Sequence, residues 1–467
     1  MRFTSSRKTG RRWAVAARIA LLLALASFYA IAANTHATRV NTSKARGDQS
    51  GYLYDAEVLY HNWHGATPPK LVDRNRMPVY GGFLALFYDP AMSDPEFFVL
   101  GRRLNIALSL GLLAALAFVF ARFLPPIAWM NLTLFLAFGY FVFKAGYVQS
   151  ELLFYSLFFL AFLTCCSLFT RRRALPTLGL AALCGALLGV THLTKAAMPP
   201  FAAVFLLAYF GNEAAGLIAR RRRKETGPLS TTERLARAGA GLVVLVSFLA
   251  VLAPYLSNSH RVFGHYFYNV NSTFYVWYDD WPHASVGTYS HGDHVGWPQM
   301  PASELPGPAR YWRDHSLAQI ASRLGAGFED MIVRSYHTFW YLKYVCLFFA
   351  LTALLIARRP RAFADLVRRN AGLFAFLVLY AIMGLFTTAF YSPISGTGTT
   401  RFLLAHVLPA SFVLFRFFTR PPFAEATGTI AGVTVTTGHF HLLVSVVLGL
   451  DILFTVWPRL MTTYGGF

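Results

Sequence analysis

Five charged residues stand beside the ends of apolar segments: Asp48, Arg76, Glu151, Lys195 and Arg401. A charge near hydrocarbon is costly unless it is paired, hydrated or used in function. Asp48, in Gly-Asp-Gln-Ser-Gly-Tyr, could accept a proton from an attacking hydroxyl or amine. Arg76 and Arg401 could bind a phosphate, which arginine holds through two parallel hydrogen bonds. These residue types suggest a reaction centre at a membrane surface.

Each of the five also has an ordinary structural explanation. Asp48 could be a solvated loop carboxylate, and Arg76 and Arg401 could contact lipid head groups. Glu151 opens an apolar segment, where the helix dipole favours an acid. Lys195 follows an apolar segment, where lysine usually extends its ammonium group to the interface. Only their joint position can favour chemistry, so the elements that carry them decide between these interpretations.

The composition is that of a polytopic membrane protein. Of its 467 residues, 55% are hydrophobic and 13% are charged, and the mean hydropathy is +0.45. Apolar stretches that can cross a bilayer core of about 30 Å recur along the chain. We predict an all-α fold with about 11 transmembrane helices, over residues 13–34, 104–122, 125–143, 150–170, 176–193, 197–218, 239–257, 336–357, 371–390, 402–418 and 439–457.

The basic residues indicate which side each loop faces. The net charge of +21 comes from short clusters between apolar spans: Arg7–Arg12, Arg171–Arg173, Arg220–Lys224 and Arg358–Arg361. Cytoplasmic loops carry such clusters. Alternation from a cytoplasmic N-terminus places the clusters inside and the five charged residues outside, in a multi-pass protein of the inner (plasma) membrane. The basic residues do not share one soluble face, so no nucleic-acid partner is predicted.

Two long segments are expected on the outer side. Residues 35–103 contain an amphipathic stretch that we expect to form an interfacial helix, with one face made by Tyr52, Ala56, Leu59, Tyr60 and Trp63. Residues 258–335 are rich in aromatic residues, histidine and proline. Both segments are therefore candidates for contact with a substrate.

The chain divides into a membrane module and a short C-terminal part. Residues 1–35 resemble a signal peptide, but their apolar run of about 20 residues favours an uncleaved first span. We assign residues 1–418 to the catalytic membrane module. Residues 419–467 are expected to hold a cytoplasmic loop and the last span.

Motifs for metals, nucleotides and serine nucleophiles have little support. The four cysteines lie in or beside apolar spans, without the CxxC spacing of a thiolate site. His291-Gly-Asp293-His294, together with His283 or Asp279, could ligate zinc, although this spacing is weak evidence. Walker, dinucleotide-binding and Gly-x-Ser-x-Gly motifs do not occur. No metal ligand is assigned, and a divalent cation remains an open alternative.

In chain order, the motifs around these residues resemble the GT-C superfamily of integral-membrane glycosyltransferases. The likeness is to the branch of protein O-mannosyltransferases and the lipid A aminoarabinose transferase, over about residues 13–418. The similar elements are Gly-Asp48-Gln-Ser-Gly-Tyr-Leu-Tyr-Asp-Ala, Arg76-Met-Pro-Val-Tyr, Gly101-Arg-Arg-Leu-Asn-Ile-Ala-Leu, Tyr147-Val-Gln-Ser-Glu151, Gly189-Val-Thr-His-Leu-Thr-Lys195, Leu252-Ala-Pro-Tyr and Arg401-Phe-Leu-Leu before Leu408-Pro.

The resemblance implies a reaction and a role for each residue. Such enzymes, hexosyl- or pentosyltransferases of class EC 2.4, pass a sugar from a polyprenyl phosphate to a glycan, lipid or protein acceptor on the outer side. Asp48 would be the general base of a single inverting displacement, and Glu151 would bind or orient the sugar. Arg401, Lys195 and Arg76 would bind the donor phosphate. The sugar and acceptor pocket is expected to include Tyr52, Asp55, His192, Asp279 and Asp280.

The sequence departs from the family pattern at two positions. Gln49 follows Asp48 where the family often has a second acid. Asn75 precedes Arg76 in place of the usual acid, which removes a carboxylate that a divalent cation could use.

Two other functional classes remain open. A flippase or transporter for a lipid-linked sugar would also need outer cations, but it should carry polar residues deep inside several spans. The nearest candidates, Asn131 and Lys144, both lie close to predicted span ends. An oligosaccharide polymerase or ligase shares polyprenyl donors but lacks the early Asp and Lys elements. The motifs therefore favour the transferase.

Overall fold

The chain contains helices that are long and apolar enough to cross a membrane, as predicted. The computed structural model describes residues 4–67, 76–170, 174–223, 231–290, 301, 303–338, 342–395, 399–425, 427–430 and 433–462. Within these residues, nine helices are long and apolar enough to cross a membrane: Asp94–Phe123, Pro126–Lys144, Glu151–Leu168, Ala174–Thr194, Met198–Ala219, Leu235–Phe263, Ala371–Ser395, Arg401–Phe418 and Thr437–Thr462.

Each of these nine helices overlaps a predicted span. The predicted first span, 13–34, lies within helix α1 (Thr4–Arg39), which is not among the nine. The predicted span 336–357 is divided between α14 (Leu317–Thr338) and α15 (Leu342–Arg358). The total of about 11 spans therefore stays a prediction.

The chain folds into two compact units whose segments alternate along the sequence. Unit 1 contains Met1–Ser50, Ala91–Leu152 and Thr427–Gly466. Unit 2 contains Gly51–Pro90 and Leu153–Ala426. Two helices begin in unit 1 and continue in unit 2, namely α2 (Gln49–Trp63) and α7 (Glu151–Leu168).

Among the described residues, unit 1 is built around four long helical segments, namely Thr4–Arg39, Asp94–Phe123, Pro126–Lys144 and Thr437–Thr462. Its elements are α1, α4 (Asp94–Phe123), α5 (Pro126–Leu136), η1 (Ala137–Phe141), α6 (Val142–Lys144), β1 (Thr427–Ile430), β2 (Val433–Thr436), α19 (Thr437–Asp451), η5 (Ile452–Val456) and α20 (Trp457–Thr462). The aromatic ring of Phe28 on α1 packs 5.5 Å from the rings of Phe138 and Trp457. The strands β1 and β2 form an antiparallel hairpin before α19.

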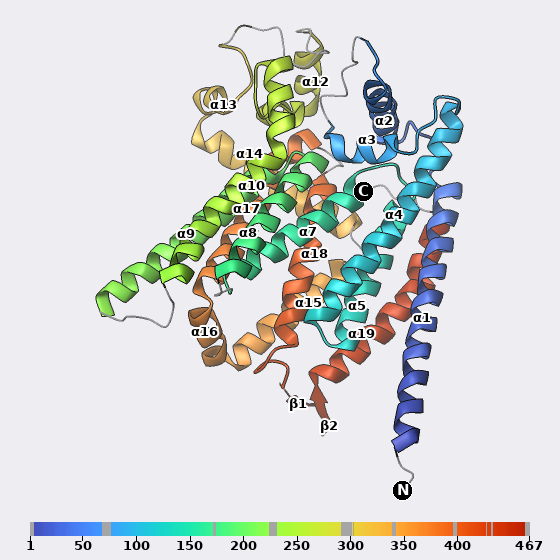
Figure 1. Cartoon of the computed structure of the whole chain (residues 1–467), viewed down its shortest axis with the longest axis vertical. Coiled ribbons are helices and arrows are strands. Elements are labelled where there is room, and N and C mark those ends of the chain that lie inside the picture. The colour runs from blue at the N-terminus through green and yellow to red at the C-terminus, as the bar shows by residue number, and fades with distance from the viewer. Residues whose placement is uncertain are drawn as a thin grey trace. The chain divides into compact units, whose positions relative to one another are not determined.

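Unit 2 contains most of the predicted outer and inner loops. Its elements, besides α7, α14 and α15, are α3 (Pro78–Ala85), α8 (Ala174–Thr194), α9 (Met198–Arg223), α10 (Thr231–Phe263), α11 (Val270–Thr273), η2 (Tyr275–Trp277), α12 (Trp281–Ser290), α13 (Pro308–Asp314), α16 (Pro360–Arg369), α17 (Ala371–Ser395) and α18 (Thr399–Phe418). Helices α8 and α10 lie side by side over much of their length (Figure 1).

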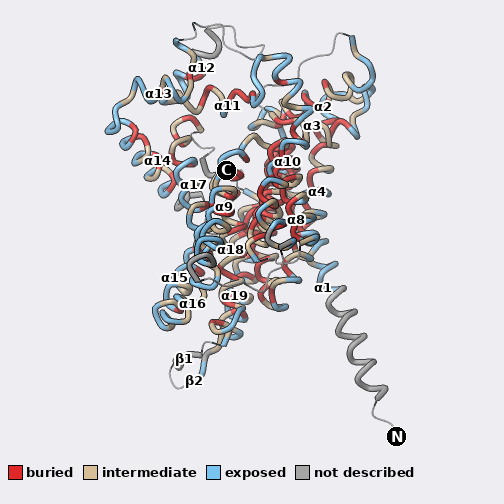
Figure 2. Tube along the Cα trace, turned by 60° about the vertical axis from the view of Figure 1, so that its left-hand side comes forward, coloured by how far each residue is buried: buried red, intermediate tan, exposed pale blue. Residues whose placement is uncertain are grey.

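The two ends of unit 2 differ in what they carry. Helices α11, α12 and α13 gather at one end (Figure 2), and α16 lies at the opposite end (Figure 1). The aromatic segment 258–335 and the basic cluster Arg358–Arg361 are therefore separated along the spans, as alternation requires. The side of the membrane that each end faces stays a prediction.

Helix α2 confirms the predicted helix in the first long segment. Tyr52 and Ala56 are buried on its expected apolar face, whereas Trp63 at its end is 54% exposed. Asp55 is also buried, at 4% exposure. The ring of Tyr52 lies 5.1 Å from that of Tyr80 on α3. Helix α2 therefore packs against a second helix.

Small residues let α8 approach α10 closely. A Cβ atom on Gly185 would lie 2.3 Å from the carbonyl oxygen of Val244 and 2.7 Å from the Cβ of Ser247. Helices in membranes often meet through such residues because they allow the backbones to touch. Since Lys195 directly follows the end of α8, this contact helps to set its position.

We expect Gly185→Ala to destabilise the protein by about 1–3 kcal/mol, because the new methyl group must push α8 from α10. Gly179→Ala on the same helix is the matched control, since a Cβ there has no atom within 4 Å. The apparent melting temperature in detergent should fall for Gly185→Ala and stay or rise for Gly179→Ala. Equal melting temperatures would contradict the close approach.

Candidate functional site

The loop before α2 is held by two buried side-chain amides. Asn41 Nδ2 donates to Gln49 Oε1 and Gln49 Nε2 donates to Asn41 Oδ1, both at 2.8 Å. Gln49 Nε2 also donates to the carbonyl oxygens of Arg46 at 3.0 Å and Ser43 at 3.3 Å. Both amides are fully buried. The chain on the N-terminal side of Asp48 therefore has a defined conformation.

The same amides join this loop to the segment before α7. Asn41 Nδ2 donates to the carbonyl oxygen of Gly146 at 2.8 Å, and the Val148 N–H donates to Gln49 Oε1 at 2.9 Å. Gly47 has φ of 63°, and a Cβ on it would lie 2.8 Å from Nε2 of Gln149. Gln49 thus accepts a hydrogen bond from Val148, and Gly47 lies close to the side chain of Gln149. Both partners are close in sequence to Glu151.

The backbone segments that carry Asp48 and Glu151 therefore lie next to each other within unit 1. Asp48 is partly exposed, whereas Glu151 is 2% exposed at the first position of α7. The side-chain oxygen of Gln149 is buried and accepts no hydrogen bond from any described residue. A buried acceptor of this kind needs a partner, such as a water or a ligand hydroxyl.

A buried lysine lies on the same segment. Lys144 is 4% exposed, and its Nζ lies 5.0 Å from the ring centroid of Tyr147. Asn105 on α4 donates to the carbonyl oxygens of Lys144 at 3.3 Å and Ala145 at 3.0 Å, which fixes the end of the helix. Unit 1 therefore encloses a cation and an acid on one short stretch, residues 144–151.

In unit 2, Lys195 lies among aromatic rings. Its Nζ is 5.0 Å from the ring centroid of Phe402 and 6.0 Å from that of Phe154. Aromatic faces attract cations because their quadrupole places negative charge there. Phe402 directly follows Arg401, so the ends of α8 and α18 meet at this ring.

Arg401 is tied to the same helix as Phe154. Its backbone carbonyl oxygen accepts a hydrogen bond from the Tyr155 hydroxyl at 2.5 Å. Phe154 and Tyr155 are neighbours in the first turns of α7, and each contacts one of the two cation-bearing elements. The structure therefore brings together the segments that carry Lys195 and Arg401, and a shared role for the two cations stays a prediction.

Arg76 lies over the first turn of α2. Its guanidinium is 5.4 Å from the ring centroid of Tyr52. A Cβ on Gly51 would lie only 2.0 Å from the guanidinium carbon, so any larger residue there would displace it. The neighbouring residues Arg74 and Asn75 lie outside the described residues.

One short segment is connected to residues near all three cations, directly or through Tyr391. The ring of Phe267 lies 6.1 Å from that of His192 on α8, and Asn269 Nδ2 lies 3.9 Å from the sulfur of Met77, next to Arg76. Asn271 accepts a hydrogen bond from Tyr391 at 3.1 Å. The Tyr391 ring in turn meets the ring of Phe402 at 5.2 Å, next to Arg401. We name residues 267–271 the bridging segment.

The bridging segment belongs to an aromatic core formed by the second long segment. That core consists of buried residues from 268–284 together with the end of α17, namely Tyr268, Val270, Phe274, Tyr275, Ala284 and Ile394. The aromatic residues of this loop thus pack on one another and on a span. This packing gives the loop a fixed structure beside the cations.

His192 is buried among aromatic rings, and one of its ring nitrogens has no hydrogen-bond partner among the described residues. It is 4% exposed and lies among the rings of Phe248, Tyr255 and Phe267. Its Nδ1 is buried and has no hydrogen-bond partner in the described part of the chain. Packing therefore accounts for most of its surroundings, and a role in a sugar pocket stays a prediction.

The acidic pair at 279–280 has structural partners. Asp279 Oδ2 lies 3.1 Å from Nε2 of His315, and Asp279 Oδ1 lies 3.5 Å from Nη1 of Arg323. Asp280 accepts a hydrogen bond from the His283 N–H at 2.9 Å. This backbone bond holds the pKa of Asp280 below its usual value. Asp280 therefore orders the start of α12, and Asp279 ties the preceding loop to His315 and Arg323. Pocket roles for both acids stay predictions.

Arg323 on α14 connects three parts of unit 2. It is 8% exposed, and it donates at 3.0 Å to the carbonyl oxygens of Val276 and Phe390. Its guanidinium carbon lies 4.1 Å from the ring centroid of Phe390. The loop before α12, helix α14 and the end of α17 are therefore joined by one side chain.

No metal centre is formed by the described residues. Among them, no group of three or more His, Cys, Asp or Glu side chains could hold a metal ion. His291, Asp293 and His294, the centre of the zinc alternative, lie outside the described residues. Cys165 and Cys184 contact each other at 3.3 Å between their sulfurs, as free buried thiols.

The predicted site residues thus form two groups. Unit 1 holds Asp48 and Glu151 on adjoining loops, and unit 2 holds Arg76, Lys195 and Arg401 around the bridging segment. Sequence reasoning had placed all five on one face of the membrane, and that joint site remains a prediction.

Several residues of structural weight were not identified from the sequence. In the sequence, Gln49 is distinguished only as a departure from a diacid. No sequence motif marks Asn41, Gln149 or Tyr155 as structurally important. Two amides flanking an acid after a span are a signal that could have suggested a clamp. The contacts of Tyr155 and the bridging segment depend on distant parts of the chain and leave no local pattern.

Comparisons with known proteins do not assign a family. No protein-family model, no curated protein and no solved structure matches the chain. The resemblance to the GT-C superfamily rests on the sequence motifs alone.

We expect Gln49→Glu to destabilise the protein, because a carboxylate cannot donate to the oxygens of Asn41, Arg46 and Ser43. Each buried group left without a hydrogen bond costs about 1–3 kcal/mol. The apparent melting temperature in detergent and the monodisperse fraction should both fall.

Gln319→Glu is the matched control. Only the side-chain oxygen of Gln319 is used, accepting from the Ser316 N–H and hydroxyl at 2.8 Å, so the carboxylate can replace it. A Gln49→Glu protein as stable as the Gln319→Glu protein would disprove the amide clamp.

Proposed function

We propose that this protein is a glycosyltransferase that moves a sugar from a polyprenyl-phosphate donor to an acceptor at the outer face of the membrane. In this proposal Asp48 is the general base, and Glu151 binds or orients the sugar. Arg401 and Lys195 bind the donor phosphate, with Arg76 contributing. The acceptor is a glycan, lipid or protein, and the enzyme class is hexosyl- or pentosyltransferase.

The observation that carries the proposal is the gathering of cations in unit 2. Lys195 Nζ lies 5.0 Å from the ring centroid of Phe402, the residue after Arg401. The bridging segment contacts His192 on the helix before Lys195, Met77 next to Arg76, and Tyr391, whose ring meets Phe402. Three cations near the ends of spans can together bind an anion that has several oxygens. A phosphate with several oxygens, held in the membrane by its lipid, supplies such an anion.

The surroundings of Asp48 support a role as a base. Its neighbour Gln49 is held by hydrogen bonds to Asn41, whereas Asp48 itself is partly exposed. A positioned and accessible carboxylate is what general base catalysis requires. The buried acceptor of Gln149 adds a polar group that a sugar hydroxyl can satisfy.

The proposed step is a single displacement at the anomeric carbon. The acceptor hydroxyl or amine gives its proton to Asp48 and attacks the anomeric carbon, and the bond from this carbon to the phosphate oxygen breaks. The electron pair of that bond stays on the phosphate, whose growing charge the cations stabilise. Removing one fixed contact to such a developing charge typically lowers the rate by about 10²–10³.

One of the two candidate polar residues of the flippase alternative has a structural role. Asn131, one of its two candidate polar residues, donates to the His441 carbonyl oxygen at 2.8 Å and accepts from Ser445 at 2.7 Å. Packing of α5 on α19 therefore uses this side chain. A polymerase or ligase remains distinguishable by its product, because it would extend a glycan instead of adding one sugar.

We expect Asp48→Asn to abolish sugar transfer, since the amide cannot take the proton. Cells that lack the gene are complemented with each variant, and envelope glycans, glycolipids and glycoproteins are compared by mass spectrometry. The glycan that depends on the wild-type gene should be missing with Asp48→Asn.

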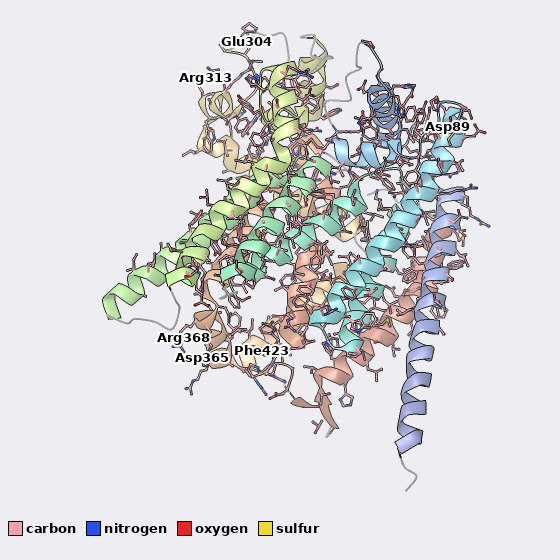
Figure 3. All side chains as sticks on the ribbon, viewed as in Figure 1. Asp89, Glu304, Arg313, Asp365, Arg368 and Phe423 are labelled. Atoms are coloured by element: carbon pink, nitrogen blue, oxygen red, sulfur yellow. The ribbon has the colours of Figure 1, made fainter. Side chains whose placement is uncertain are left out.

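Asp89→Asn is the control for that experiment, because Asp89 is an exposed acid of the same predicted outer segment (Figure 3). It should restore the glycan, at similar membrane levels of protein. Full complementation by Asp48→Asn would rule out this residue as the base.

We expect Arg401→Ala to weaken binding of undecaprenyl phosphate by roughly 10–100-fold, the effect of losing a charged hydrogen bond. The backbone bond from Tyr155 to Arg401 does not depend on the side chain, so the fold should remain. Binding to the purified protein is measured through its intrinsic tryptophan fluorescence.

Undecaprenol, which lacks the phosphate, is the comparison ligand. Its affinity should be the same for wild-type protein and Arg401→Ala, and Arg401→Lys should retain part of the phosphate binding. Equal affinities of wild type and Arg401→Ala for undecaprenyl phosphate would argue against the clamp.

A further inference from the structure

Helix α16 lies at the level where two spans end. Its Phe363 ring is 5.9 Å from the ring of Phe374 and 6.3 Å from that of Phe417. Phe374 is in the first turn of α17, and Phe417 is in the last turn of α18. Both helices are candidate spans, so α16 lies beside the membrane boundary.

The two faces of α16 differ in chemistry. Phe363, Leu366 and Val367 are half-buried on one side. Arg361 and Arg368 are exposed on the other, together with Arg369, at the spacing of one helical face. No residue of α16 is buried (Figure 2). Such a helix lies in the plane of an interface, with its apolar side toward hydrocarbon or protein.

The charge of this surface is strongly positive. Residues 358–369 contain five arginines and one aspartate. The aspartate, Asp365, pairs with Arg368 on the exposed side (Figure 3). The remaining arginines of this stretch have no acid on α16 to compensate them, which leaves a surface that attracts anions.

The segment after α18 adds a further arginine. Arg359 Nη1 donates to the carbonyl oxygen of Pro422 at 2.7 Å, which ties this segment to the start of α16. Arg420 lies on it, and burial lowers the pKa of Arg420 below its usual value. A partly buried guanidinium is stabilised when an anion binds beside it.

We propose that α16 and the adjoining Arg420 form a binding surface for the head groups of anionic phospholipids. The exposed arginines contact the lipid phosphates, and the position of α16 at the span ends sets it at head-group depth. A lipid fits better than a soluble anion, because the phosphate and the acyl chains meet this amphipathic helix at the same level. The surface lies at the end of unit 2 opposite to α12 and α13 (Figure 1), and the proposal does not depend on the transferase activity.

The test is native mass spectrometry of the full chain in detergent, titrated with dioleoyl phosphatidylglycerol or dioleoyl phosphatidylcholine. Wild-type protein should bind phosphatidylglycerol more tightly. Each basic residue near an anionic surface contributes roughly fivefold, so the triple variant R361Q/R368Q/R369Q should lose on the order of 100-fold.

The control is R261Q/R310Q/R313Q, which removes three arginines at or near the other end of unit 2, where Glu304 and Arg313 are labelled in Figure 3. It should bind phosphatidylglycerol as wild type does. R361K/R368K/R369K keeps the charge and should also bind within about fivefold of wild type. If the glutamine variant fails to fold, the comparison of phosphatidylglycerol, phosphatidylcholine and glycerol phosphate on wild-type protein still decides the test.

Three results would overturn the proposal. They are equal affinity of the wild type for the two lipids, equal losses in the α16 and control triple variants, or binding of soluble glycerol phosphate as tight as that of phosphatidylglycerol. The last result would mean a simple anion site without lipid recognition.

Discussion

Backbone groups that are buried in the protein must find hydrogen-bond partners within it, since water does not reach them. Where α1 ends and α2 has not begun, side chains replace the helical bonds. Asn41 and Gln49 serve the carbonyl oxygens of Ser43, Arg46 and Gly146 and the N–H of Val148. Because these bonds are directional, the loop has one conformation, and the backbone on both sides of Asp48 is held in place.

The spans were predictable because apolar length is a local property of the sequence. The helix at residues 49–63 was predictable for a similar reason, as its apolar residues repeat with helical spacing. Its second buried side, with Asp55, was not, because it depends on α3 packing against it. The role of Gln49 was missed for the same physical reason: its partner Val148 lies 99 residues away.

The charged residues show the same division between local and distant information. Lys195 and Arg401 could be predicted as candidate site residues because they are cations beside the ends of spans. The structure brings the segments that carry them together. The rings of Phe154 and Phe402 that surround Lys195 could not be chosen in advance, because aromatic residues are common throughout the chain. Asp279 was expected near a pocket, but its partners Arg323 and His315 show that it also orders the loop.

The bridging segment makes contacts at every second position, through residues 267, 269 and 271. Each contact reaches a different helix end, so the three cannot be adjusted one at a time. An inserted or deleted residue within 267–271 would shift the later contacts by one position, so that the segment could no longer reach all three helix ends. Length variation between related chains should therefore be excluded from these five residues, although they form part of a long loop.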